Sequence, residues 1–301
     1  MTQKRHGEPL PLGGDGLPYS KGLMARALIA AGVPADRSYQ LARRVEVDLA
    51  ERDEPTVGIE RLEELAREIL GLDEGERAIS RLRRLAELQA LDLPLIILIG
   101  GSTGTGKSTV AAEVAHRLGI TRVASTDFIR QTMRAFFSTE FMPAIHYSSF
   151  EAGQAVDVDV TGDPTILGFV EQCRHVCVGV DAAIRRALTE GWSMVLEGVH
   201  LVPGLVTSEL AGALVVQVVV AIDNEGAHRM HFHVRDSATG GVRAMDKYLD
   251  RLGDIRRIQS YIVDRARREE VPVVDNANVE RTIDEVLELV MQAAERAMAR
   301  L

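Results

Sequence analysis

One segment near the middle of the chain, residues 95–109, constrains the fold more than any other. It reads LIILIGGSTGTGKST, so four apolar residues that favour strands run directly into a glycine-rich loop ending in Gly106, Lys107 and Ser108. This is the spacing of the Walker A phosphate-binding loop, or P-loop. An apolar strand precedes the loop and a helical pattern follows it, which is the context that phosphate binding requires. A glycine-rich turn that matched by accident would lack both flanks.

Each residue type in this loop has a physical task. The glycines let the backbone curl so that successive amides point inward at phosphate oxygens, and the next helix adds the positive end of its dipole. Lys107 is expected to reach the β- and γ-phosphates, and Ser108 to place its hydroxyl on Mg²⁺. The sequence therefore predicts a site for ATP and Mg²⁺. Its nucleotide contacts would come from Gly101, Ser102, Thr103, Gly104, Thr105, Gly106, Lys107, Ser108 and Thr109.

The composition excludes several classes of protein. The chain has 301 residues, enough for two domains, and its 46% apolar content can fill a core. A net charge of −9 argues against a surface for nucleic acid or anionic membranes, while an anionic small molecule needs only a local basic pocket. No apolar run approaches the about 20 residues of a membrane span, and no signal peptide is evident. We expect a cytoplasmic protein, with a homo-oligomer left open.

The apolar pattern divides the chain in two. Residues 1–91 show helical periodicity in four stretches after a polar, glycine-rich lead-in over 1–16. Residues 92–301 alternate strand and helix, which predicts an α/β fold with a five-stranded, mostly parallel sheet flanked by helices. The expected strands lie near 95–99, 121–125, 193–197, 214–221 and 271–274, and the expected helices near 107–118, 127–137, 166–189 and 279–299.

A second candidate site follows the strand expected near 121–125. Asp127 stands at the carboxyl end of that strand, beside the P-loop, where open parallel sheets bind ligands. Its carboxylate could align an acceptor hydroxyl or accept its proton. Arg130 and Arg134 share a helix face and could hold an anionic acceptor. The alternative is that Asp127 caps a helix that carries ordinary solvated arginines.

The strand expected near 193–197 also ends in a carboxylate. Glu197 takes the place of a Walker B aspartate and is expected to hold Mg²⁺ or orient the acceptor, with His200 lining the same crevice. The alternative is a strand-end glutamate in a loop. Farther on, basic residues surround Gly240 and Gly241, a pattern typical of either a lid over transferring phosphates or a solvated helix face. These basic residues are Arg229, Arg235, Arg243, Lys247, Arg251, Arg256 and Arg257.

Two groups of potential metal ligands are expected not to bind metal. Cys173 and Cys177 are one helical turn apart and do not form a C-x-x-C pair, so they are typical of reduced packing residues. No regular helix or strand places all three histidines at 228, 231 and 233 on one face.

Five segments together make the chain resemble the archaeal-type 2-phosphoglycerate kinase family. They read LPLIILIGGSTGTGKST, STDFIRQTMR, FMPAIHYSSFEAG, LEGVHLVPG and VPVVDNANVERTIDEV, and they spread over about residues 90–285. The P-loop alone is common to many kinases, whereas its combination with HYSSFEAG and LEGVHLVPG is much more specific. Members of this family also carry an N-terminal ATP-cone, a helical nucleotide-sensing module. The segment LPYSKGLMARALIAAGVPADRSYQLARRVEVDL resembles the core of that module, with Lys4, Arg5, Lys21 and Arg26 as basic candidates for phosphate contact.

The resemblance implies transfer of the γ-phosphoryl group of ATP to the 3-hydroxyl of 2-phosphoglycerate, giving 2,3-bisphosphoglycerate and ADP. It implies two partners, a nucleotide and a small anionic phosphorylated substrate. The expected catalytic residues are Lys107, Asp127, Arg130 and Glu197; the acceptor would meet Asp127, Arg130, Arg134 and His200, and the metal Ser108 and Glu197.

Two kinds of alternative stay open. The acceptor could be a nucleoside monophosphate, an antibiotic hydroxyl or another sugar-acid phosphate, although 4% aromatic content leaves few residues to stack on a base. The protein could instead be a non-catalytic, ATP-responsive regulator. Asp127 and Glu197 argue against that alternative, because a mere binder does not need two carboxylates at strand ends.

Overall fold

The computed structural model describes residues 19–91, 93–157, 161–207, 210–239 and 245–299, and the chain forms two compact units. The first unit comprises residues 1–93 together with 115–121 and 290–301, and the second comprises 94–114 and 122–289. The lead-in over 1–16, with Lys4 and Arg5, and the Gly240–Gly241 pair with Arg243 lie outside the described residues.

The first unit contains the four expected helices, α1 (Lys21–Ala30), α2 (Ala35–Arg52), α3 (Ile59–Leu70) and α4 (Leu72–Ala90). Their apolar residues repeat at helical spacing and are buried together, among them Met24, Leu28, Leu41, Leu62, Leu65, Ile79 and Leu82. Gly71 separates α3 from α4 with a φ of +91°, a conformation that side-chain-bearing residues rarely adopt. Tyr39, which shares the apolar pattern of α2, is exposed.

One carboxylate crosslinks the helices of this first unit. The buried side chain of Asp48 on α2 accepts hydrogen bonds from Arg61 on α3, and it also pairs with Arg44 and Arg52 on its own helix. The hydrogen bonds from Arg61 lower the pKa of Asp48, and this effect outweighs the opposing effect of burial. This ion-pair cluster therefore stabilises the unit only while Asp48 is ionised.

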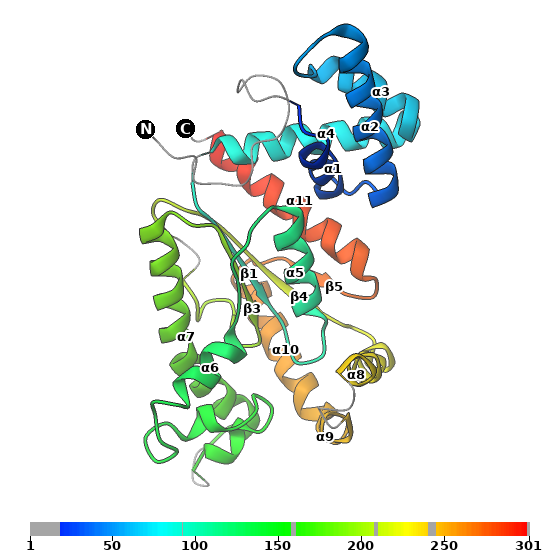
Figure 1. Ribbon diagram of the computed structural model, residues 1–301. Helices are drawn as coiled ribbons and strands as arrows, with labels where there is room; N and C mark the ends of the chain where they lie inside the picture. The colour runs from blue at the N-terminus through cyan, green and yellow to red at the C-terminus, as the bar shows by residue number, and fades with distance from the viewer. Residues whose placement is uncertain (1–18, 92, 158–160, 208–209, 240–244, 300–301) are drawn as a thin grey trace. The chain divides into compact units, whose positions relative to one another are not determined.

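The second unit is built on a five-stranded parallel sheet in the order β2-β3-β1-β4-β5 (Figure 1). The strands are β1 (Leu95–Gly100), β2 (Val123–Ser125), β3 (Met194–Gly198), β4 (Leu214–Ala221) and β5 (Val273–Asp275). Between them run α5 (Lys107–Arg117), α6 (Thr126–Met133), α7 (Pro164–Glu190), α8 (Glu225–Thr239), α9 (Met245–Asp250), α10 (Leu252–Arg268) and α11 (Val279–Met298), with two 3-10 turns, η1 (Pro143–His146) and η2 (Ala152–Ala155). This architecture confirms the predicted α/β fold.

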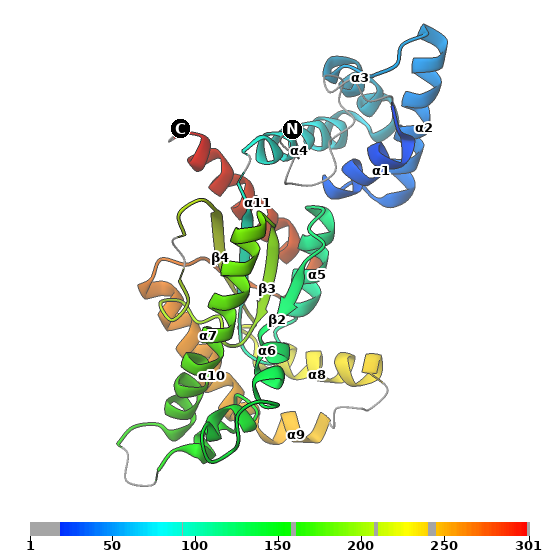
Figure 2. The same ribbon diagram turned by 60° about the vertical axis from the view of Figure 1, so that its left-hand side comes forward.

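Helices cover both faces of the sheet. Ile96 and Leu98 of β1 share a buried cluster with α7, and Val219 of β4 shares one with α7 and α10, so these two helices cover one face. Helices α5 and α11 lie on the other face (Figures 1 and 2). Cys173 and Cys177 are free, buried residues of α7, as the packing interpretation predicted.

The sheet order determines where a ligand can bind. The central strand β1 pairs with β3 on one side and β4 on the other. The chain leaves β1 toward β2 on the first side and leaves β3 toward β4 on the second, so the two connections run in opposite directions from the carboxyl end of the sheet. In both views α6, α8 and α9 lie at this same end of the sheet (Figures 1 and 2). Over the described part of the chain, no helix combines the length and apolarity that a membrane crossing needs.

Candidate active site at the carboxyl end of the sheet

The P-loop leaves β1 at Gly100 and enters α5 at Lys107. Gly101, Gly104 and Gly106 take φ values of +148°, +86° and +79°, so the loop needs glycine at these positions. The Nζ atom of Lys107 donates to the carbonyl oxygen of Ser102 at 3.1 Å, so the ammonium group lies across its own loop. Helix α5 therefore begins where a nucleotide phosphate would meet both its first amides and a lysine.

Two side chains from distant parts of the chain hold the P-loop from outside. His228 of α8 donates through Nε2 to the carbonyl of Thr103 at 2.8 Å, and Asn276 donates through Nδ2 to the carbonyl of Thr105 at 2.9 Å. Because these peptides are trans, the N–H groups of the residues that follow point the opposite way, away from the two side chains. The contacts thus fix the direction of the loop's amides. The sequence interpretation did not assign either residue to this loop.

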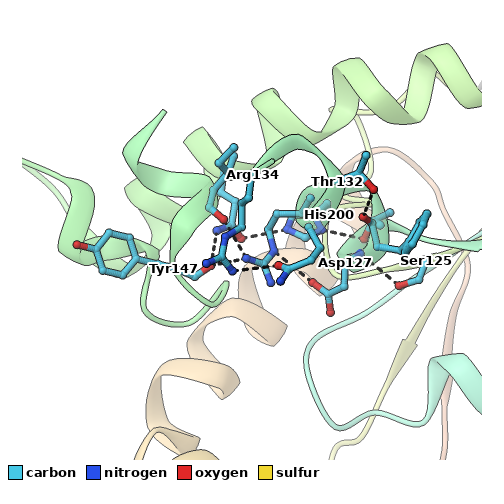
Figure 3. Close-up of polar contacts among 12 residues, drawn as sticks. Ser125, Asp127, Thr132, Arg134, Tyr147 and His200 are labelled. Carbon is cyan, nitrogen blue, oxygen red and sulfur yellow. Dashed lines mark hydrogen bonds and ion pairs between the residues drawn. The ribbon is translucent and has the colours of Figure 1, made fainter. Parts of the chain in front are cut away.

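Asp127 lies in the first turn of α6 with an exposed carboxylate. The helix is capped by Ser125, whose Oγ accepts a hydrogen bond from the backbone N–H of Asp127 at 3.2 Å. The alternative that Asp127 itself is the N-cap is therefore wrong, and its carboxylate is not used for capping. The Nε of Arg130 lies 3.5 Å from Oδ1 of Asp127 (Figure 3).

The electrostatic surroundings keep Asp127 ionised. Although the carboxylate is exposed, the protein around it displaces part of its water, which alone would raise its pKa; nearby positive charge more than offsets that effect, and the pKa is lowered. His200 contributes when protonated, and the guanidinium of Arg130 and the ammonium of Lys107 contribute at every relevant pH. Asp127 of α6 therefore lies within electrostatic range of the P-loop lysine.

Arg130 and Arg134 differ in how deeply they are buried and in what they contact. The side chain of Arg130 is only 13% exposed, and its Nη1 donates to the carbonyls of Ile145 and Tyr147, both at 2.9 Å (Figure 3). Arg130 therefore joins α6 to the η1 turn. Arg134 is half-buried and donates to Gln131 of its own helix at 3.0 Å.

His200 does not line the crevice, which corrects the expectation that it binds the acceptor. Its side chain is fully buried; Nδ1 lies 2.8 Å from Oγ1 of Thr126, and Nε2 lies 3.0 Å from Oε1 of Gln172. Burial lowers the pKa of His200 to about 3, so the ring is neutral at neutral pH. The residue is a buried link between β3 and α6.

The buried Gln172 of α7 sets the direction of this link. Its amide nitrogen donates to the carbonyls of Ala144 and Tyr147, at 2.6 and 3.1 Å, so its oxygen must accept from Nε2–H of His200. The Nδ1 atom of His200 must then accept from the hydroxyl of Thr126. Arg130 contacts both the carbonyl of Tyr147 and the carboxylate of Asp127, so it closes this series of contacts into a ring around Asp127. A lone glutamine on the apolar face of α7 was the only sequence signal for this role.

Glu197 and Ser108 are the remaining candidates for metal contact. Glu197 is 7% exposed near the end of β3 and pairs in register with Ser125 of β2 and Ile99 of β1. Ser108 is exposed in the first turn of α5. Nowhere in the described residues do three His, Cys, Asp or Glu side chains gather as a metal cage. A site of one carboxylate and one hydroxyl fits Mg²⁺ bound together with phosphates, because that ion keeps few protein ligands.

The basic stretch after β4 is distributed over three helices. Arg229 pairs with Glu225, Lys247 with Glu151, and Arg251 and Arg257 with Asp254. Arg256 donates to the carbonyls of Ile222 and Asp223, just after β4. Arg235 belongs to α8, and its side chain lies outside what the structure describes.

These features define a P-loop kinase fold: a parallel sheet, a P-loop after its central strand, one carboxylate near the end of β3 and another in the first turn of α6. Three curated relatives are named 2-phosphoglycerate kinase. The relative from Pyrococcus furiosus is 36% identical over 94% of this chain and 93% of its own length. The relative from Methanothermobacter thermautotrophicus is 38% identical over 90% of this chain and 89% of its own length, and that from Methanopyrus kandleri 33% identical over 90% and 83%.

This chain belongs to the 2-phosphoglycerate kinase family, because identity at this level extends over nearly all of it. No family model matches the chain. Among solved structures, a gluconokinase from Sinorhizobium meliloti matches 69% of this chain and 98% of its own length, at 15% identity and a TM-score of 0.38.

Proposed function

We propose that this protein transfers the γ-phosphoryl group of ATP to the 3-hydroxyl of 2-phosphoglycerate, giving 2,3-bisphosphoglycerate and ADP. The observation that carries the proposal is the exposed carboxylate of Asp127 in the first turn of α6, which lies 3.5 Å from Nε of Arg130 and close enough to the P-loop lysine Lys107 for that charge to lower its pKa. A base within the electrostatic reach of the phosphate-binding lysine is what transfer to a hydroxyl requires. The relatives named 2-phosphoglycerate kinase supply the identity of the acceptor.

The nucleotide would be held by the P-loop over residues 101–109. Its amides and the first turn of α5 would surround the β- and γ-phosphates, and Lys107 would leave the carbonyl of Ser102 to pair with them. Ser108 and Glu197 would hold Mg²⁺, which, when bound with the nucleotide, neutralises charge on the transferring phosphoryl group.

The acceptor would bind on the α6 side of this loop. Its hydroxyl oxygen forms the new bond to the γ-phosphorus while the bond from that phosphorus to the β–γ bridging oxygen breaks. The hydroxyl proton passes to the Asp127 carboxylate, which is already ionised. Arg130 and Arg134 would face the phosphate and carboxylate of the acceptor, and most of the rate enhancement would come from positioning and charge neutralisation.

Replacing Asp127 tests this assignment. Asp127→Asn should reduce kcat by about 10²–10⁴-fold, the usual contribution of a general base, and leave the KM for ATP nearly unchanged. Asp264→Asn is a matched control, because Asp264 and Asp127 are similarly exposed, at 60% and 63%. Phosphorus NMR should identify 2,3-bisphosphoglycerate as the product. A kcat equal to that of the wild type in Asp127→Asn would contradict the assignment.

We also propose that residues 1–91 form an ATP-cone-like regulatory domain ahead of a kinase domain over 92–301. The support is the resemblance of the segment beginning at Leu17 and the four helices of the first unit. Of the basic candidates for phosphate contact in the described part of this unit, Lys21 is engaged by Glu46 at 3.0 Å. Titration of the wild type with labelled ATP tests the proposal: a second equivalent bound per chain would report the N-terminal unit, and a single equivalent would contradict nucleotide binding there.

A further inference from the structure

Four rings form a continuous stack beside the active site. His228 and Phe232 of α8 stack with centroids 5.4 Å apart, Phe232 and Tyr248 of α9 stack at 5.2 Å, and Tyr248 meets Phe150 edge-on at 5.7 Å. We call these four residues the aromatic column. The chain has few aromatic residues, 4% of the total, so their gathering here across three separate segments is a specific feature of the fold.

The first end of the aromatic column touches the P-loop at two successive residues. His228 donates to the carbonyl of Thr103, as described above. A Cβ atom added to Gly104 would lie 2.4 Å from Cζ of Phe232, so this ring lies directly against the Gly104 backbone. Closely packed interiors contain little empty space. A movement of the P-loop backbone therefore displaces Phe232, and a P-loop held by bound phosphates holds Phe232 in place.

The other end of the aromatic column is part of the segment between α6 and α7. Phe150 is buried, and its neighbour Glu151 pairs with Lys247 of α9 at 2.8 Å. The Nζ of Lys247 also lies 5.9 Å from the centroid of the Phe150 ring. Upstream, the carbonyl of Tyr147 is held by Arg130 and Gln172, two members of the ring around Asp127. The segment over 143–155, which we call the acceptor segment, is thus fastened both to α9 and to the Asp127 site.

We infer that His228 and Phe232 are positioning residues through which nucleotide bound at the P-loop orders the acceptor segment. The inference rests on the proposed function for the identity of the two substrates. Phosphates that fix Thr103 and Gly104 would fix Phe232, and the stack would transmit this constraint through Tyr248 to Phe150. Because coupling between two binding sites is reciprocal, a bound acceptor would in turn tighten nucleotide binding.

Hydrogen exchange of the full chain tests the inference without any acceptor. Backbone amides over 148–155 are followed with and without Mg²⁺ and a non-hydrolysable ATP analogue. In the wild type, saturating analogue should slow their exchange by at least about fivefold, the lower limit of ordinary allosteric coupling. Phe232→Leu, at analogue concentrations that again saturate the P-loop, should reduce this protection to less than about twofold. Tyr248→Leu interrupts the stack one ring farther from the nucleotide and should act in the same way.

Phe169→Leu is the matched control. Phe169 and Phe232 are both buried in the same hydrophobic cluster, and Phe169 pairs with Tyr261, outside the aromatic column. This variant should keep the protection seen in the wild type. Unchanged protection in Phe232→Leu and Tyr248→Leu, or equal loss in Phe169→Leu, would overturn the inference. If the wild type did not bind the analogue, the proposed function would fail; if it bound without protecting 148–155, only the coupling would fail.

Discussion

The Nδ1 atom of His200 accepts a hydrogen bond from Oγ1 of Thr126 over 2.8 Å, and Thr126 immediately precedes Asp127. This contact joins the loop after β3 to the first turn of α6 beneath an exposed carboxylate. Gln172 extends it to the acceptor segment, and Arg130 returns from that segment to Asp127. Buried side chains can thus hold the exposed carboxylate of Asp127, the proposed catalytic group, in place.

Thr126→Val tests this buried link. The change keeps the shape of the side chain and removes the hydroxyl that Nδ1 of His200 needs, so the free energy of unfolding should fall by about 1–3 kcal/mol. Misplacement of Asp127 should lower kcat by up to about 10²-fold while the KM for ATP stays close to that of the wild type. Urea denaturation and steady-state kinetics measure the two effects. Thr132→Val, on the exposed face of α6, should change neither; equal effects in both variants would contradict the account.

Gly198→Ala tests the closeness of β3 and α6. Gly198 has a φ of +149°, and a Cβ there would lie 1.8 Å from Oγ1 of Thr126, an impossible contact without backbone movement. The variant should lose about 1–3 kcal/mol of stability or more, because both strain and overpacking act against it. Gly253→Ala on α10 meets nothing within 4 Å and should be neutral or stabilising. Thermal denaturation compares them, and a Gly198→Ala protein as stable as the wild type would refute this geometry.

Arg130→Lys separates charge from geometry. A lysine keeps the positive charge but cannot place one planar donor group on the carbonyls of Ile145 and Tyr147 while facing Asp127. The KM for the acceptor should rise by about tenfold or more, equivalent to about 1.4 kcal/mol, and the KM for ATP should change far less. Arg134→Lys, which alters an arginine that donates to Gln131 one turn earlier, should have the smaller effect. An unchanged acceptor KM in Arg130→Lys would remove Arg130 from the acceptor site.

The stability of the first unit should depend on pH through Asp48. The pKa of this carboxyl in the folded protein lies below its ordinary value of 3.8, so its contribution is present above that pH and is lost as the pH falls through the folded value. Asp48→Asn should lose about 1–3 kcal/mol at pH 7, and the difference from the wild type should shrink toward pH 3. Calorimetry of the full chain over this range measures it.

Glu64→Gln is the control for Asp48. Glu64 also pairs with Arg61, but its side chain is 61% exposed, so this variant should cost less than about 1 kcal/mol at any pH. A difference between Asp48→Asn and the wild type that stayed constant down to pH 3 would show that the ionised carboxylate is not what stabilises the helices.

Local sequence patterns were sufficient to predict most of the fold. The structure contains the strands expected from the apolar runs at 95–98 and 214–221, and the helices expected from the periodicity before Pro94. Their own residue pattern was enough to predict which of their side chains are buried. The edge strands β2 and β5 are shorter than expected, because an edge strand pairs on one side only. Helices α8 to α10 were hidden in the arginine-rich stretch, where charged residues obscure the apolar period.

The candidate active site was predictable only where a motif specifies it. The P-loop that carries Lys107 and the helix turn that carries Asp127 each follow a strand directly, so their position at the edge of the sheet follows from chain order. The burial of His200 depends on its tertiary partners, although its apolar neighbours Val199 and Leu201 were a signal for it. The contacts of His228 and Asn276 with the P-loop span 125 and 171 residues, and no local pattern contains such a pairing.

The most direct test of the central claim is the rate of ADP formation from Mg²⁺ and ATP with different acceptors. The panel is 2-phosphoglycerate, 3-phosphoglycerate, glycerate, nucleoside monophosphates and no acceptor. The account predicts turnover with 2-phosphoglycerate that far exceeds every other rate and disappears in Lys107→Ala. Tight ATP binding with no turnover that depends on 2-phosphoglycerate would contradict it.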